Sequence, residues 1–276
     1  MSRFKMFLAC VMLSLASASA QEYNWKTVPM DASRTGCKAT SADNVDRAMG
    51  VMRADGTYVS PSGKEFDKGS ATARVASVVI AAQPQMADLK KVIAYSQQEM
   101  PKERGESTLS NWFVGVVMDK VSALAGKKCD VGICNFGGIR KSMPQGEVIL
   151  DDIQSMFPFR NYLAMVEMKG SRLREIFELM AREGFQAVGG ASIEVVDGKL
   201  ASVKVGDEPL DDNKEYAVAT ISFLLNGGDG LYLAENALKL NEYDVLIFDA
   251  VMEHINAVTS AGEPIVAPEV KHVTIR

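Results

Sequence analysis

The sequence has few of the side chains from which hydrolytic metal centres are built. Its only two histidines, His254 and His272, stand in neither an HxH nor an HExxH spacing. A two-metal hydrolytic centre normally combines several histidine and aspartate ligands, and a zinc site also draws on histidine or cysteine. The acid pairs at 151–152 and 211–212 leave an all-carboxylate Mg²⁺ site as an alternative, although acid pairs in turns are usually only solvated. We therefore expect this chain to hold no metal cofactor and His254 to be structural.

Motifs for nucleophilic and phosphate-loop chemistry are missing as well. The chain has no GxSxG elbow, no Walker A loop and no GxGxxG after a strand, and Cys134 has no obvious histidine partner. These absences favour a binding protein over a self-sufficient enzyme.

The apolar stretch in the first twenty residues is too short to span a bilayer, and the rest of the chain has no apolar run of membrane length. Those twenty residues are typical of a cleaved secretory signal, with Arg3 and Lys5 before a short apolar stretch and Ala-Ser-Ala at 18–20. Lipid modification of Cys10 is the alternative, but the apolar stretch ahead of it would be only about four residues, too few for a signal core. We expect an exported, periplasmic protein.

Basic residues are also in the minority. Cleavage after Ala20 would leave 28 basic against 35 acidic residues, a net charge of −7. This disfavours general binding to nucleic acid, which needs a basic surface.

The predicted mature chain has an odd number of cysteines: Cys37, Cys129 and Cys134. If 129–134 is a strand, its ends lie about 16 Å apart, well beyond the roughly 7 Å Cα limit for a disulfide. We interpret Cys129 and Cys134 as core residues, with a bond from Cys37 as the alternative.

The composition changes near residue 83. Residues 21–83 are rich in Gly, Ser, Asp and Lys, which indicates an extension of short strands and loops, and the alternating run 73–82 is typical of a strand. Residues 84–276 form the main domain, beginning with a helix predicted from the spacing of apolar residues at 86, 89, 92 and 93.

Strands and helices are mixed in the main domain without a strict βαβ alternation, which favours an α+β fold with a mixed sheet flanked by helices. The predicted elements are a helix from Ser107 to Gly126, a strand at 129–134, a short helix before Pro158, a strand at 162–170, an amphipathic helix capped by Ser171, a hairpin around Asp197-Gly198, and a buried strand at 215–225.

Three loops, each following an apolar run, carry side chains suited to recognition. "NFGGIR" (135–140) offers an amide, backbone N–H groups beside two glycines, and an arginine, an environment that suits a phosphate or carboxylate. "FPFRN" (157–161) and "FLLNGGDG" (223–230) add two aromatic rings, a second amide and a carboxylate able to accept from hydroxyls. Taken singly, each loop has an ordinary explanation as a turn or as core. The candidate site residues are Asn135, Gly137, Gly138, Arg140, Phe159, Asn161, Phe223, Gly228 and Asp229.

These three motifs in this order, with "ESTLSNWFVGVVMD" ahead of them, resemble the C-terminal substrate-binding domain of the 5′-nucleotidase family over about residues 84–273. The resemblance implies an α/β/β/α-like fold that holds a nucleobase between Phe159 and Phe223. It also implies that Asp229 holds the ribose hydroxyls, that Asn135 and Arg140 lie near the phosphate, and that Asn161 touches the base.

The sequence departs from the family pattern in three respects. Arg104 lies only near the position of a further phosphate-contacting arginine, and Arg160 replaces a common glycine beside the base site. Family members hydrolyse nucleotides with an N-terminal metallophosphatase domain, and residues 21–83 are too short for it and contain no histidine.

We therefore expect a nucleotide- or nucleoside-binding protein of nucleotide catabolism. Its hydrolase activity would require a separate metallophosphatase chain, and divalent metals are expected only in that partner. A binder or scavenger without a catalytic partner is the alternative, and a self-sufficient carboxylate–Mg²⁺ enzyme is a third, less favoured interpretation.

Overall fold

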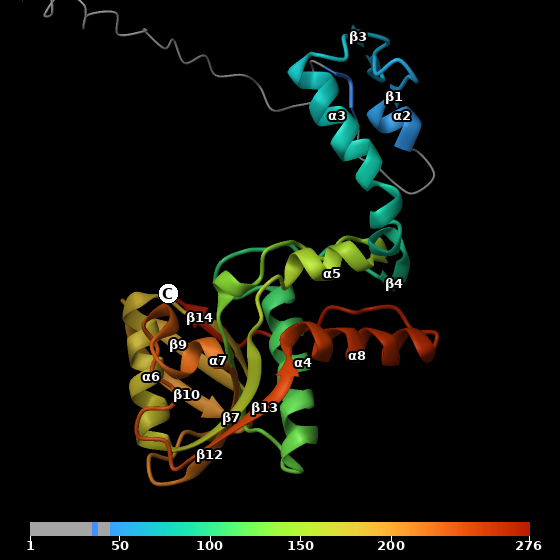
Figure 1. Ribbon diagram of the computed structural model, residues 1–276. Coiled ribbons are helices and arrows are strands. Elements are labelled where there is room, and N and C mark those ends of the chain that lie inside the picture. Colours follow the sequence, from blue (N-terminus) through green and yellow to red (C-terminus); the bar gives the residue numbers. More distant parts are fainter. Residues whose placement is uncertain (1–34, 38–44) are drawn as a thin grey trace, which may run out of the picture. The chain divides into compact units, whose positions relative to one another are not determined.

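The chain divides into two units, Met1–Gln83 and Pro84–Arg276. The computed structural model describes residues 35–37 and 45–276, and the predicted signal lies outside them. None of the described helices is both long enough and apolar enough to cross a membrane. Figure 1 shows the elements of both units, which are described separately below.

The N-terminal unit combines a small antiparallel sheet with one longer helix. Its sheet order is β1-β2-β3. The elements are α2 (Val45–Met49), β1 (Val51–Met52), β2 (Tyr58–Val59), β3 (Glu65–Phe66) and α3 (Ala71–Ala82).

The strand predicted at 73–82 is wrong, because this segment is helix α3. Ser70 caps the helix, its hydroxyl oxygen accepting from the N–H of Ala73 at 3.1 Å. An N-cap of this kind satisfies a backbone donor that has no partner within the helix. The Ala and Val residues of this segment are compatible with the two-residue period of a strand and with the 3.6-residue period of a helix. The Ser70 cap favours the helix.

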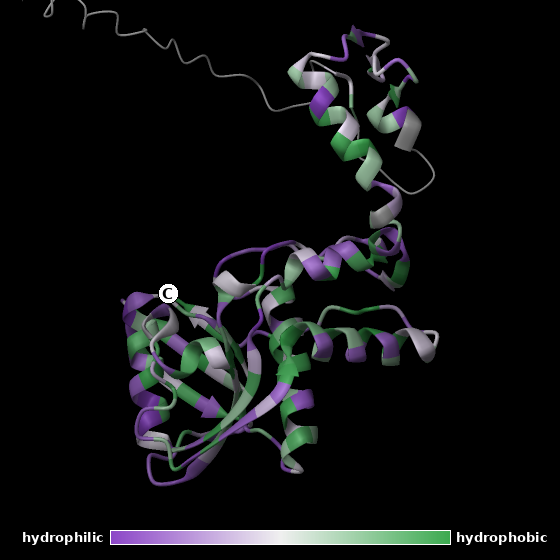
Figure 2. Ribbon diagram, viewed as in Figure 1, coloured by the Kyte–Doolittle hydropathy of each residue, from purple (hydrophilic) through white to green (hydrophobic). Residues whose placement is uncertain are grey.

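A five-stranded mixed sheet forms the centre of the C-terminal unit, and its strands other than the edge strand 239–246 are mostly hydrophobic (Figure 2). Its order is β13-β7-β12-β5-β8, with β12 and β5 parallel and the other pairs antiparallel. The strands are β13 (Lys239–Leu246), β7 (Tyr162–Lys169), β12 (Glu215–Ile221), β5 (Val131–Cys134) and β8 (Ala187–Gly189).

Helix α4 (Thr108–Ala125) packs against this sheet, as the sequence predicted. Ser107 caps it, with its hydroxyl accepting from the Ser110 N–H, and Gly126 ends it in a left-handed conformation with φ of 61°. The helix and β5 approach closely at Gly132, where a Cβ would lie 2.7 Å from Val114 Cγ2. Only glycine allows this contact without a shift.

A second, four-stranded sheet has the order β11-β10-β9-β14. Its hairpin turns at Asp197-Gly198 as predicted, with positive φ at both residues. The amphipathic helix α6 (Gly170–Glu183) contacts β10 and β7, but its N-cap is Lys169 rather than Ser171. The strands are β9 (Ala191–Val196), β10 (Lys199–Val205), β11 (Glu208–Pro209) and β14 (Val273–Ile275).

The helix predicted from residue 84 is wrong. Two 3-10 turns, Pro84–Met86 and Asp88–Lys90, precede strand β4 (Val92–Ser96), which pairs antiparallel with β6 (Gly146–Ile149). Pairing with a segment some fifty residues away overrides the local spacing. The short helix α5 (Leu150–Met156) follows β6 as predicted, and α8 (Ile247–Ser260) contacts α4, β4 and α5.

Within each unit the described cysteines are free thiols, and the alternative of a bond from Cys37 to the C-terminal unit stays a prediction. Cys129 and Cys134 are buried core residues, as predicted. Burial raises the pKa of both thiols. They are therefore protonated and unreactive at neutral pH.

The C-terminal unit is thus a mixed α and β structure with helices flanking its sheets, as the sequence predicted.

Candidate functional site

Three strand ends meet at one edge of the five-stranded sheet. Because β5 and β12 are parallel, their C-terminal ends lie at the same edge, and β7 begins there because it is antiparallel to β12. The register pairs Ile221 with Leu163. The Thr220 hydroxyl donates to the Ile133 carbonyl at 2.8 Å and ties β12 to β5 at this end. The loops 135–140 and 222–230 and the segment 157–161 therefore leave the sheet at one edge.

The first loop holds a buried amide against its own backbone. Asn135 is 6% exposed, and residues Phe136–Gly138 form a 3-10 turn. A Cβ on Gly138 would lie 2.6 Å from the Asn135 Oδ1 atom, so only glycine leaves room for this side chain. Within the described chain this oxygen has no hydrogen-bond donor. A buried acceptor without a donor is uncommon and suits a site that receives one from a ligand.

The second loop departs from the predicted strand at 215–225. The strand ends at Ile221, and Ser222–Leu225 form the short helix α7 before a 3-10 turn at Gly228–Gly230. The Phe223 ring lies against Gly228, where a Cβ would be 2.7 Å from ring atoms. Asp229 is exposed and has a left-handed backbone, with φ of 48°. The orientation of its carboxylate is set by the backbone of the tight turn at Gly228–Gly230.

Asp229 lies beside the first loop. The position of a Cβ on Gly137 would be 4.0 Å from Asp229 Oδ2 and 3.7 Å from Asn135 Nδ2. The structure therefore brings the carboxylate and the buried amide to the same glycine.

Arg140 connects the first loop with the FPFRN segment. Its guanidinium carbon lies 5.8 Å from the centre of the Phe159 ring, within cation–π range, and its Nη1 donates to the Gly137 carbonyl at 3.3 Å. Phe159 is 48% exposed and Phe223 is 42% exposed. No ring-to-ring contact joins these two among the described residues.

Asn161 is the least constrained of the predicted site residues. Its carbonyl accepts from the Ile247 N–H at 3.0 Å, and its side chain is half-buried. The next residue, Tyr162, donates its N–H to the Ser222 hydroxyl at 3.0 Å. This bond ties the end of the FPFRN segment to α7.

The edge therefore combines a guanidinium, a buried amide oxygen, a carboxylate and two exposed aromatic rings. Such a set can bind a planar ring, a pair of hydroxyls and an anionic group. Neither histidine belongs to it, since His254 lies in α8 and His272 beside β14. The set is suited to recognition more than to proton transfer.

A family model described as the C-terminal domain of 5′-nucleotidase matches residues 85–236, more than half of the chain. The chain belongs to this family. The 5′-nucleotidase C-terminal domain thus includes all three loops of the edge, and the N-terminal unit lies before the match.

Curated relatives agree with this assignment. Over 135 residues the chain is 32% identical to the protein UshA of Yersinia enterocolitica, covering 47% of this chain and 24% of that protein. It is 30% identical over 108 residues to a 5′-nucleotidase of Vibrio cholerae, covering 37% of this chain and 20% of that protein. The chain therefore spans about a quarter or less of the length of these relatives.

Solved structures share the fold. The 5′-nucleotidase precursor of Thermus thermophilus superposes with a TM-score of 0.65 at 24% identity, covering 74% of this chain and 43% of that one.

Two side chains beside the site were missed in the sequence. Gln186 Oε1 accepts from the Phe136 N–H at 2.7 Å and holds the first loop. Tyr232 packs its ring against Gly227, where a Cβ would lie 2.9 Å away. Gln186 had no local signal, because its partner is fifty residues away in the sequence. Tyr232 could have been identified from the sequence, because it is an aromatic residue two positions after the GGDG turn.

Arg104 and Arg160 are both exposed, and neither forms an ion pair within the described chain. The roles assigned to these arginines and to the nine site residues stay predictions.

The acid pairs have structural partners. Asp152 accepts from the Ile149 N–H at 2.9 Å and pairs with Lys141 at 2.7 Å, and Asp212 pairs with Arg174 at 2.7 Å. Nowhere in the described chain do three or more His, Cys, Asp or Glu side chains lie close enough to share a metal ion. These residues do not fit a two-metal phosphatase centre.

Proposed function

We propose that this chain is an exported recognition module of nucleotide catabolism. The sheet edge binds a nucleotide or nucleoside, and a separate metallophosphatase chain supplies the metals and the hydrolysis of the phosphate ester. The base stacks between Phe159 and Phe223, Asp229 accepts from the ribose hydroxyls, and Arg140 with Asn135 receives the phosphate.

The observation that carries the proposal is the convergence of the three loops. Arg140 lies over the Phe159 ring, and the Asp229 carboxylate lies beside the same glycine as the Asn135 amide. Phe159 and Phe223 are both partly exposed, which leaves their rings accessible to a planar ligand, and both belong to motifs that resemble those of the family. Membership in the 5′-nucleotidase C-terminal domain family supports a nucleotide as the ligand.

Binding is tested by thermal shift and calorimetry with adenosine, AMP and ADP. A ligand at 100 times its Kd should stabilise the protein by about 2.7 kcal/mol. Because stacking contributes about 1–3 kcal/mol per base, Phe159→Ala and Phe223→Ala should each weaken binding by roughly 5-fold to 150-fold. Tyr95→Ala is the matched control, since Tyr95 is an exposed aromatic of the same unit in β4. Equal effects of all three substitutions would contradict the proposed base site.

Catalysis is tested separately, with the purified chain, Mn²⁺ or Zn²⁺, and AMP. We expect no phosphate release from this chain alone, and release when an exported phosphatase with DxH and GNH(E/D) motifs from the same genome is added. Phosphate release from AMP by the chain alone, if it persists after washing with a chelator, would contradict the proposal that a separate chain carries out the hydrolysis. Nucleoside binding without any stimulating phosphatase would instead indicate a binder or scavenger.

A further inference from the structure

The turn that carries Asp229 has an unusual backbone conformation. Gly227, Asp229 and Gly230 all have positive φ, at 104°, 48° and 75°. Aspartate tolerates the left-handed region better than most residues, but such a conformation persists only where the surrounding structure imposes it. Among the described residues the Asp229 carboxylate has no hydrogen bond or ion pair that would orient it. Its direction therefore depends on the contacts that hold the turn.

Backbone hydrogen bonds close this turn, and two aromatic rings pack against its glycines. The Gly227 N–H donates to the Leu231 carbonyl at 2.7 Å, and the Leu231 N–H donates to the Gly228 carbonyl at 2.9 Å. The Phe223 ring lies against Gly228, where a Cβ would be 2.7 Å from ring atoms. The Tyr232 ring lies against Gly227 in the same way, at 2.9 Å. Both rings therefore restrict where the turn can lie.

The segment after the turn fixes the position of the Tyr232 ring. Leu231 and Leu233 are buried in the core, and the intervening Tyr232 is 54% exposed. The Tyr232 carbonyl accepts from Arg172 Nη2 and from the Glu235 N–H, both at 3.1 Å. Arg172 lies in the first turn of α6 and also pairs with the Glu235 carboxylate at 3.3 Å. Helix α6 thus anchors the backbone of the residue whose ring lies against the turn.

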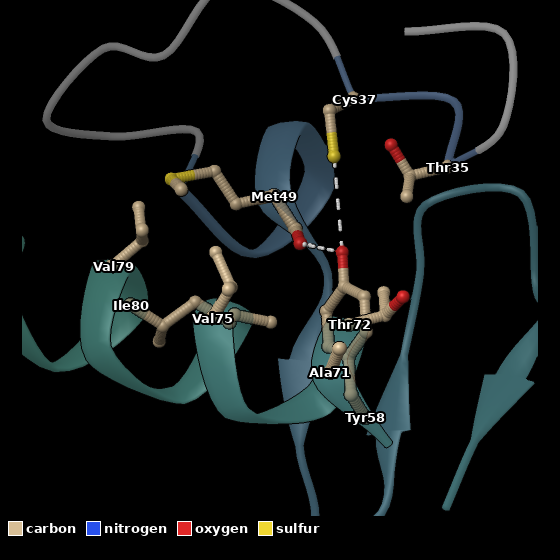
Figure 3. Close-up of a pocket in the computed structure, with 10 residues that line it drawn as sticks. Thr35, Cys37, Met49, Tyr58, Ala71, Thr72, Val75, Val79 and Ile80 are labelled. Atoms are coloured by element: carbon tan, nitrogen blue, oxygen red, sulfur yellow. Dashed lines mark hydrogen bonds between the residues drawn. The ribbon is translucent and has the colours of Figure 1, made fainter. Parts of the chain in front are cut away.

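The other tyrosine with a well-defined contact in this chain, Tyr58 of the N-terminal unit, is held through its hydroxyl instead. That hydroxyl donates to the Met49 carbonyl at 2.6 Å, as a dashed line in Figure 3 shows. The Tyr232 hydroxyl has no hydrogen bond among the described residues. Since ring carbons of Tyr232 contact the turn, Tyr232→Phe should preserve the contact and Tyr232→Ala should remove it.

We propose that Tyr232 and Arg172 are positioning residues for Asp229, which fix the turn so that its carboxylate can accept from a pair of ligand hydroxyls. This inference rests on the proposed function and adds two residues to it. The Asp229 Oδ2 atom lies 4.0 Å from the position of a Cβ on Gly137, beside the first loop. A hydroxyl donates to a carboxylate over about 2.5–3.0 Å, so a shift of the turn by about 1 Å would break these bonds. Neither positioning residue needs to contact the ligand.

The experiment measures by calorimetry the affinity of the full chain for adenosine and for 2′,3′-dideoxyadenosine, which lacks both hydroxyls. The wild type should bind adenosine roughly tenfold or more tightly, since hydrogen bonds to a charged acceptor are strong. In Tyr232→Ala this ratio should fall about fivefold or more, with the affinity for dideoxyadenosine unchanged, because that ligand has no hydroxyl bonds to lose. Arg172→Gln should lower the ratio by a smaller factor, because the Glu235 N–H still donates to the Tyr232 carbonyl.

Control variants separate positioning from a loss of packing. Tyr232→Phe keeps the ring and should give the wild-type ratio. Glu175→Gln removes another ion pair of Arg172, at 2.9 Å, without changing the bond to the Tyr232 carbonyl, and should leave both affinities unchanged. In a double-mutant cycle, Tyr232→Ala should lower the ratio no further in Asp229→Asn, because both changes act through the same carboxylate.

The outcomes separate this inference from the proposed function. A wild-type ratio in Tyr232→Ala would overturn the positioning role and leave the proposed function standing. Equal weakening of both ligands would also overturn it, since Tyr232 would then contact the base or support the whole site. If the wild type binds both nucleosides equally, Asp229 accepts from no ribose hydroxyl, and the positioning role fails with that part of the proposed function. Binding of neither nucleoside by the wild type would overturn the nucleoside site and this inference together.

Discussion

The two units of this chain place their apolar residues very differently. In the C-terminal unit one continuous cluster of buried side chains extends from Ala94 to Val273 and includes residues of α4, α6, α8 and both large sheets. Among the described side chains of the N-terminal unit, the buried apolar ones are Ala48, Tyr58 and Ala73. The three valines of α3 (Val75, Val78 and Val79) are exposed instead, and Ile80 is half-buried.

The difference in buried apolar side chains indicates how much each unit is stabilised by its own core. A close-packed interior holds side chains in defined positions and makes every lost methylene costly. A small unit with few buried groups gains little from its own core and depends more on a partner. The C-terminal unit is therefore equipped to hold a site, whereas the described part of the N-terminal unit has few buried side chains that could hold one in place.

The largest expected effect comes from the core of the C-terminal unit. Phe113 is fully buried and its ring centre lies 4.7 Å from that of Phe157. Phe113→Ala should lower the free energy of unfolding by about 3–5 kcal/mol, whereas Val78→Ala in α3 should change it by at most about 0.5 kcal/mol. Urea unfolding followed by fluorescence measures both. Similar losses in the two variants would mean that α3 is packed as tightly as α4, which would undo the comparison.

A carboxylate in each unit provides the second comparison. Glu106 accepts from the Asn111 amide at 2.7 Å and from the N–H groups of His272 and Val273 at 2.8 and 3.0 Å, which ties α4 to the start of β14. In the N-terminal unit Glu65 has one exposed ion pair, with Arg53 at 2.6 Å.

Glu106→Ala should therefore cost about 1.5–3 kcal/mol, since it leaves several donors without their charged acceptor, and Glu65→Ala should cost at most about 1 kcal/mol. Chemical unfolding of both variants checks this. A larger cost for Glu65→Ala would show that the exposed ion pair stabilises the fold more than the part-buried hydrogen bonds of Glu106 do.

Strong local signals explain what could be predicted from the sequence. Helix α4 was predicted from the Ser107 cap and from Gly126 at its end, and the hairpin from Asp197-Gly198. The segment 73–82 has an ambiguous period, and the strand β4 depends on pairing with β6. The predicted strand at 73–82 and the predicted helix from residue 84 were wrong for this reason: an N-cap determined the first segment and a distant strand partner the second.

The same limit applies to the candidate site. Its loops were recognisable as motifs, because glycines, amides and rings stand together in the sequence. Their convergence depends on the pairing of β5 with β12, whose residues are 87 positions apart, and Gln186 contacts the first loop from just before strand β8. No local pattern encodes such a register, so the geometry had to come from the fold.

The tight packing of the C-terminal unit extends to the glycines of its first loop. A Cβ on Gly138 would lie 2.6 Å from Asn135 Oδ1, whereas a Cβ on Gly137 would meet nothing closer than 3.7 Å. Gly138→Ala should displace the amide and weaken nucleotide binding by about 1–3 kcal/mol, and Gly137→Ala should have a smaller effect. Calorimetry with AMP measures the difference. Equal affinities would show that Asn135 moves aside freely and that this loop is no more rigid than an ordinary surface turn.

The smallest expected effect is a change of the unfolding free energy with pH. It concerns histidine, which only one of the two units contains. Both histidines of the chain belong to the C-terminal unit. His254 packs edge-on against Trp112, with ring centres 5.9 Å apart, and burial lowers its pKa below the usual value of 6.5, although Asp119 opposes this.

Because the folded state disfavours the protonated imidazole, the unfolded chain binds this proton more readily. The stabilising contribution of the neutral ring is present above the unfolded-state pKa and is lost as the pH falls through the folded-state pKa. Unfolding free energies of the wild type should therefore decrease between pH 8 and pH 5 more than those of His254→Gln. If His254→Gln keeps the full pH dependence, carboxylates and not His254 cause the loss of stability. The packing of His254 in α8 against Trp112 in α4 would then give the C-terminal unit no pH response of its own.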